Sequence, residues 1–170
     1  MSKAVLLPHV PSSVTTARQR LCSELRTWGI GAAKIDDAAL VISELLSNAL
    51  RHAEPLPPPF PPDSLRVAWN IAIDAGESHE SAWIEISVSD GGSDTLPRVA
   101  HADETAQGGR GLGIVQHLAT KWGTEVDENT TTVWAVLDLP ASDISSDENH
   151  TWPSRTAGQE TYQHMTSVNG

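Results

Sequence analysis

Glu44 and Asn48 stand four residues apart in a segment whose apolar residues recur with helical spacing. Residues at this spacing share one face of a helix, so the carboxylate and the amide oxygen would point into the same space. A helix interior is an unfavourable place for Asn, because its side chain competes for backbone hydrogen bonds. Oxygen ligands suit Mg2+, and a carboxylate can accept a proton from a hydroxyl group or water. The pair is a candidate metal and proton-transfer site, with a solvated polar face as the alternative.

Asp90 continues the inward-facing positions of an expected strand, after the alternating apolar residues of 82–88. A buried carboxylate must find a hydrogen-bond donor or face a cavity. A purine amino group is one such donor. Gly91 and Gly92 follow directly and would let the backbone approach a ligand closely. An ordinary Asp-Gly turn is the competing interpretation.

A glycine run, Gly108-Gly109-Arg110-Gly111-Leu112-Gly113, leads into an expected helix. Glycines before a helix N-terminus expose backbone N–H groups that suit bound phosphates. The irregular segment 91–110 could close over a nucleotide as a lid with glycine hinges. The run is not a dinucleotide fingerprint, because Ile114 stands where the third glycine would be. It is not a P-loop either, because none of the three lysines follows a glycine.

Apolar periodicity predicts the elements that position these residues. We expect helices at 14–28, capped near Ser12 and Ser13, at 36–52, and at 111–121, where Gly123 would end the last one. The expected strands are 4–7, 65–73, 82–88, 124–126 and 131–139. This order predicts an α+β two-layer sandwich, with helices on one face of a mixed, mostly antiparallel sheet. Residues 55–63 form a proline-rich connection, and 141–170 are expected to be a polar, disordered tail after a domain spanning 1–140.

Composition excludes several classes of function. The formal net charge is −11, with 22 acidic residues against 11 basic ones, so direct binding of nucleic acid is not expected. No run approaches the ~20 apolar residues of a membrane helix, so we expect no membrane association and a cytoplasmic location. The single cysteine, Cys22, is expected to be a small core residue.

Three segments, in this order, closely resemble the three boxes of the GHKL ATP-binding superfamily. They are ELLSNALRHA (44–53), a strand ending in SDGG (89–92), and GGRGLGI (108–114). The resemblance spans nearly all of residues 4–139. It implies a Bergerat-type fold that binds ATP with Mg2+.

Within that superfamily, the compact size and the opening helix resemble the bacterial anti-sigma factor serine/threonine kinases. About forty residues before the Asn-containing box cannot supply the phospho-accepting hairpin of a histidine kinase. The resemblance implies a kinase that phosphorylates an anti-sigma antagonist protein and sequesters a sigma factor, and it makes a homodimer an expectation. An ATP-dependent partner-binding module without kinase activity and a small ATP hydrolase remain the alternatives.

The resemblance also implies roles for individual residues. Asn48 would hold Mg2+, Glu44 would be the general base, and Asp90 would accept the adenine amino group, with Gly92 allowing close approach. Two arginines and four residues of the third box would serve the phosphates: Arg51, Gly109, Arg110, Gly111, Leu112 and Gly113. The chain departs from the usual middle box at Ser93 and Asp94, which puts the detail of the adenine-side loop in question.

Overall fold

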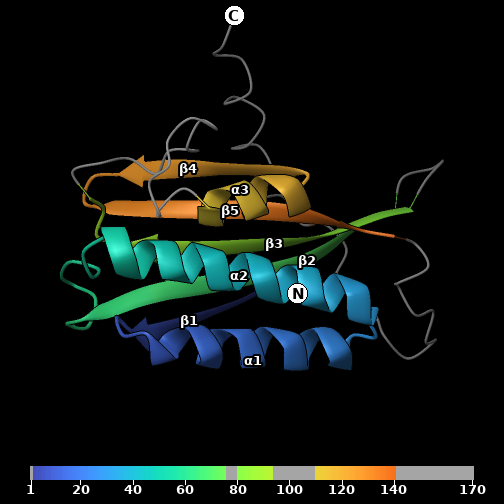
Figure 1. Ribbon diagram of the computed structural model, residues 1–170, viewed down its shortest axis with the longest axis horizontal. Coiled ribbons are helices and arrows are strands. Elements are labelled where there is room, and N and C mark those ends of the chain that lie inside the picture. The colour runs from blue at the N-terminus through green and yellow to red at the C-terminus, as the bar shows by residue number, and fades with distance from the viewer. Residues whose placement is uncertain (1, 76–79, 94–109, 141–170) are drawn as a thin grey trace, which may run out of the picture.

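The computed structural model describes residues 2–75, 80–93 and 110–140. These residues form five strands and three helices (Figure 1). In chain order they are β1 (Ser2–Pro8), α1 (Ser12–Thr27), α2 (Ala32–His52), β2 (Ser64–Ala75), β3 (Glu80–Asp90), α3 (Arg110–Leu118), β4 (Lys121–Asp127) and β5 (Thr130–Leu139). The predicted order of elements is therefore confirmed, and the predicted tail, 141–170, lies outside the described residues.

The strands form one sheet in the order β1-β2-β3-β5-β4. Every pairing among the described strands is antiparallel, so the sheet is not the mixed sheet that we expected. Figure 1 shows all three helices in front of the sheet, with α1 beside α2 and α3 in front of β4 and β5. The α+β two-layer sandwich is confirmed.

The core lies between the helices and one face of the sheet, because alternate strand residues point toward the helices. In β3 the inward set is Ala82, Ile84, Ile86 and Val88, each at most 3% exposed. α2 contributes the matching stripe, whose buried members are Ile35, Ala38, Val41, Ile42, Leu45, Leu46 and Ala49. Since α2 packs against α1, α3 and β3, it is the central helix of the layer.

Two helix starts differ from the expected ones. Pro11 occupies the N-cap position of α1, and no side chain caps the helix. The Ser13 hydroxyl instead donates to the Pro8 carbonyl at 2.5 Å, tying the helix to the end of β1. α2 begins at Ala32, four residues before the expected start near Asp36, because Gly31 takes the extended N-cap conformation.

The end of α3 is also earlier than predicted. α3 ends at Leu118, and Lys121 already belongs to β4, so Gly123 lies within a strand and does not end the helix. A Cβ on Gly123 would stand 2.7 Å from the Trp134 indole. This glycine is therefore explained by the close approach of a neighbouring-strand tryptophan, which local periodicity cannot reveal.

Candidate nucleotide site

α2 presents Glu44 and Asn48 at the border of its buried stripe. Both side chains are half-buried, whereas Leu45 and Ala49 beside them are at most 4% exposed. The buried side chains of Leu45 and Ala49 pack α2 into the core, while the Glu44 carboxylate and the Asn48 amide stay accessible. This placement agrees with the prediction that Glu44 and Asn48 share one face of the helix.

Asp90 ends β3 with its side chain directed inward, as the strand alternation predicted. It is only 4% exposed, and one carboxylate oxygen accepts the Gly92 backbone N–H at 2.7 Å. Burial raises the pKa of Asp90 from 3.8 to about 6, although the Gly92 hydrogen bond and the nearby positive charge of His9 act in the opposite direction. A buried carboxylate at the end of a strand is suited to accept a hydrogen bond from a ligand.

Thr131 is a further polar residue of this site that the sequence interpretation missed. It pairs directly with Asp90 across β3 and β5 and is 7% exposed. Its hydroxyl oxygen lies 3.1 Å from the position that a Cβ on Gly92 would take. The available signal was the alternation of β5, where Thr131 shares the inward parity of Val133.

A pair of backbone hydrogen bonds joins the end of α2 to the end of β3. The Glu54 N–H donates to the Gly92 carbonyl at 3.0 Å, and the Gly91 N–H donates to the Glu54 carbonyl at 2.8 Å. Gly92 has a φ of +81°, in the left-handed region that glycine adopts most readily. This junction fixes Asp90 relative to the helix that carries Glu44 and Asn48.

Gly91→Ala should lower the free energy of unfolding by about 1–3 kcal/mol, because the new methyl group would stand 2.1 Å from the Pro55 carbonyl oxygen. Chemical denaturation of the purified protein measures this change. Gly113→Ala is the matched control: its Cβ meets no atom within 4 Å. Since Gly113 lies in α3, alanine there should stabilise the fold by about 0.5–1 kcal/mol. Equal effects of both substitutions would contradict the close contact at Gly91.

The glycine run is only partly within the described residues. Gly109 lies outside them, as does most of the predicted lid, 91–110. Arg110 and Gly111 open α3. Leu112 is 2% exposed and belongs to the hydrophobic core, so only its backbone is available to a ligand. Gly113 is exposed, so packing does not require a glycine there.

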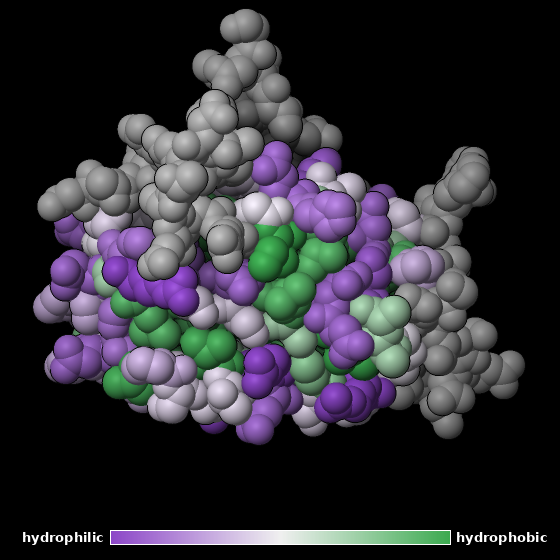
Figure 2. All heavy atoms as spheres, viewed as in Figure 1, coloured by the Kyte–Doolittle hydropathy of each residue, from purple (hydrophilic) through white to green (hydrophobic). Residues whose placement is uncertain are grey.

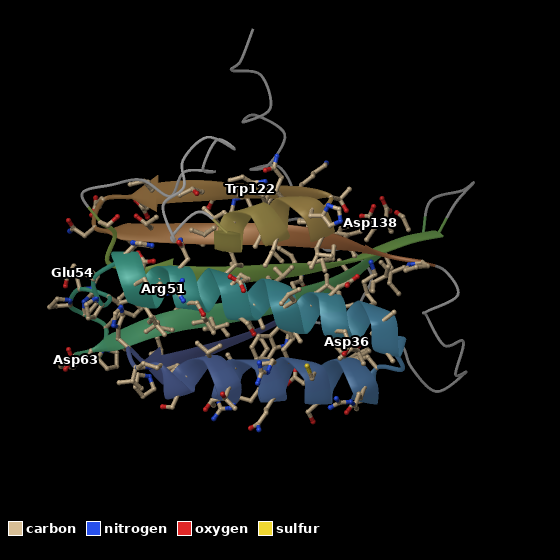
Figure 3. All side chains as sticks on the ribbon, viewed as in Figure 1. Asp36, Arg51, Glu54, Asp63, Trp122 and Asp138 are labelled. Atoms are coloured by element: carbon tan, nitrogen blue, oxygen red, sulfur yellow. The ribbon has the colours of Figure 1, made fainter. Side chains whose placement is uncertain are left out.

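Arg51 is exposed in the last turn of α2. Figure 3 labels it at the same end of the molecule as Glu54, where α2 ends. Arg51 therefore lies near the junction between α2 and β3. Its role toward phosphate stays a prediction.

A shallow apolar hollow of about 620 Å³ lies between α2 and α3, lined by Leu40, Gly113, Ile114, His117 and Leu118. Figure 2 shows the corresponding hydrophobic patch near the centre of this face. This lining offers few polar groups for phosphates.

The donor set fits Mg2+ held jointly with phosphates. Within the described ranges, no three His, Cys, Asp or Glu side chains gather as a metal cluster. Mg2+ is commonly bound by one or two protein oxygens together with substrate phosphates. The Asn48 amide oxygen supplies an oxygen of this kind on an accessible helix face.

The two-layer fold, the inward Asp90 and the polar face of α2 favour a nucleotide-binding domain of the ATPase type. The chain belongs to the family of histidine kinase-like ATPase domains, whose model matches residues 7–137. Membership of this family implies that the chain binds ATP. None of the helices among the described residues has the length and apolar character needed to cross a membrane.

Solved structures support the same fold. One similar structure contains the RsbU and RsbW domains of Rv1364c from Mycobacterium tuberculosis, with a TM-score of 0.55 and 20% sequence identity. The match covers 83% of this chain and 34% of that chain, so the present chain spans about a third of the length of that protein. No curated protein sequence matches the chain significantly.

Proposed function

We propose that this chain is an anti-sigma regulatory factor with serine/threonine protein kinase activity. It uses ATP and Mg2+ to phosphorylate an anti-sigma antagonist protein, and it sequesters a sigma factor when the antagonist is absent. The observation that carries the proposal is the buried Asp90 carboxylate, joined to α2 through Glu54 and Gly92 in a histidine kinase-like ATPase fold. The three sequence boxes and the RsbW-containing structural neighbour support the anti-sigma assignment.

Asp90 recognises the adenine base. One of its carboxylate oxygens is used by the Gly92 N–H, which leaves the second oxygen to accept a hydrogen bond from the adenine amino group. A hydrogen bond to an ionised carboxylate is stronger than a hydrogen bond between two neutral groups. Thr131 lies opposite Asp90 across the β3–β5 pair and supplies a second polar side chain beside it.

Asn48 and Glu44 serve the phosphate end. The Asn48 amide oxygen would hold Mg2+, and the ion would neutralise phosphate charge when bound. Glu44 accepts the proton of the antagonist's serine hydroxyl as the serine oxygen forms a bond to the γ-phosphorus and the bond to the β-phosphate oxygen breaks. The products are a phosphoserine and ADP. Most of the rate enhancement comes from positioning and charge stabilisation.

Nucleotide binding by this site is tested by thermal unfolding. At a nucleotide concentration of about 100 times Kd, binding adds about 2.7 kcal/mol, which raises the Tm of a domain of this size by roughly 5–10 °C. With Asn48→Ala, the Mg2+-dependent part of this rise should be lost. Asn70→Ala is the control, because Asn70 is also half-buried but points away from the helices in β2. A wild-type Tm that does not respond to millimolar ATP and Mg2+ would refute the proposed function.

A further inference from the structure

His9 lies outside the three sequence boxes. It contacts both ends of the α2–β2 connection, which comprises residues 53–63. It follows β1 directly and is half-buried. Its ring Nε2 lies 3.0 Å from the Ala53 carbonyl oxygen. Because a carbonyl can only accept, Nε2 carries the hydrogen in this contact. The His9 backbone N–H donates to the Asp63 carbonyl at 2.7 Å.

The segment that His9 holds is the one that joins Asp90 to α2. Ala53 precedes Glu54, whose backbone exchanges two hydrogen bonds with Gly91 and Gly92. Gly92 in turn donates to the Asp90 carboxylate. Three hydrogen bonds, linked by the Ala53–Glu54 peptide unit and by the backbone of Gly92, therefore connect the imidazole with the carboxylate. Figure 3 labels Glu54 and Asp63 at one end of the molecule, where this connection leaves α2.

The ring also occupies a position where α2 needs a donor. Ala53 is the C-cap residue of α2, and its N–H is bonded to the Ala49 carbonyl. The carbonyls at the end of a helix lack partners within the helix and carry the negative end of its dipole. His9 supplies a donor to one of them, and its positive form also acts on the Asp90 charge. The contacts of His9 therefore stabilise the C-terminal end of α2 as well as the end of β1.

We propose that His9 is a positioning residue for adenine recognition. Its ring hydrogen bond to Ala53 holds the α2–β2 connection against Gly91 and Gly92, and so keeps the Asp90 carboxylate in place for the base. This inference rests on the proposed function, because it requires that Asp90 receives the adenine amino group. His9 touches neither the phosphates nor the base, and its effect passes through Ala53, Glu54 and Gly92.

The test compares the binding of two probes by calorimetry: ATP, and inorganic tripolyphosphate, which lacks the base, each with Mg2+. With His9→Ala, the affinity for ATP should fall about three- to tenfold, as expected for the loss of one hydrogen bond. The affinity for tripolyphosphate should be unchanged. His9→Gln should restore ATP binding, because the Gln amide nitrogen reaches the position of Nε2. His9→Asn, whose amide is one bond shorter, should not.

His117→Gln is the matched control, since His117 is exposed on α3 beside Leu40, which is ~20 Å along α2 from Ala53. Should His9→Ala fail to fold, the comparison of His9→Gln with His9→Asn still decides the question. Equal losses of ATP and tripolyphosphate binding, or no restoration by Gln, would show a merely structural role and overturn the inference. ATP binding by His9→Ala at the wild-type affinity would overturn it while leaving the proposed function intact. No ATP binding by the wild type would overturn both.

Discussion

Glu44→Gln should reduce transfer of the γ-phosphate to the antagonist protein by a factor of about 10²–10⁴, the range that a positioned general base contributes. Affinity for ATP should stay within about twofold of the wild type, because Gln keeps the size and one oxygen of the side chain. Glu44 is half-buried on α2, next to Leu45, which is buried in the core. The substitution therefore changes the proton acceptor without changing the packing that anchors the helix.

The measurement is single-turnover transfer of labelled phosphate, with ATP affinity determined on the same samples. Glu125→Gln is the control, since Glu125 is also half-buried but lies in β4, opposite Thr132 on the sheet face away from the helices. Loss of ATP binding in Glu44→Gln would contradict its role as a base. An unchanged rate of phosphate transfer in Glu44→Gln would also contradict that role. Release of free phosphate by the wild type without any partner would favour the ATP hydrolase alternative, and ATP binding without either reaction would favour the binding module.

Local patterns were sufficient for the elements and for the inward direction of Asp90. Strand alternation places every second residue on one face, so the apolar run of β3 determines where residue 90 must point. Helical spacing likewise predicted the shared face of Glu44 and Asn48. These predictions depend on neighbours within one element, which is why they could be made without knowledge of the fold.

The parts that were missed depend on contacts between distant segments. Thr131 acquires its place beside Asp90 from the register of β5 on β3. His9 and Ala53 are 44 residues apart, and their contact requires the ends of β1 and α2 to meet. Leu112 stands within a glycine run that resembles a phosphate loop, yet its side chain belongs to the core. Each outcome depends on tertiary packing. The alternation of β5 indicates that Thr131 points inward, but it does not indicate that Thr131 lies beside Asp90.

Asp90→Asn should have opposite effects on ligand binding and on stability. Asn can still accept the Gly92 N–H through its oxygen, but its second position is then an NH2 group instead of an oxygen. That NH2 group and the adenine amino group are both donors, so they cannot hydrogen-bond to each other. Because the charged acceptor is also lost, ATP affinity should fall roughly 10²-fold. The protein without nucleotide should become more stable at neutral pH, because the variant no longer buries an ionised carboxylate.

The pH dependence of both effects follows from the pKa of Asp90, which burial raises from 3.8 to about 6 in the fold. A carboxyl group whose pKa is higher in the folded state contributes stability below the unfolded value and loses it as the pH rises through the folded value. The stability advantage of Asp90→Asn should therefore be absent below about pH 4 and complete above about pH 6. A shift of about two pKa units corresponds to about 3 kcal/mol, which raises the Tm by roughly 6–12 °C.

ATP affinity of the wild type should increase over the same pH interval in which its stability without nucleotide decreases, because the ionised carboxylate is the stronger acceptor. Thermal unfolding and calorimetry of wild type and Asp90→Asn across this interval measure the two trends together. A variant that loses both stability and ATP binding would show that Asp90 is a structural residue. A variant that gains stability and loses ATP binding would show that the fold retains a destabilising carboxylate at residue 90 because the ligand needs it there.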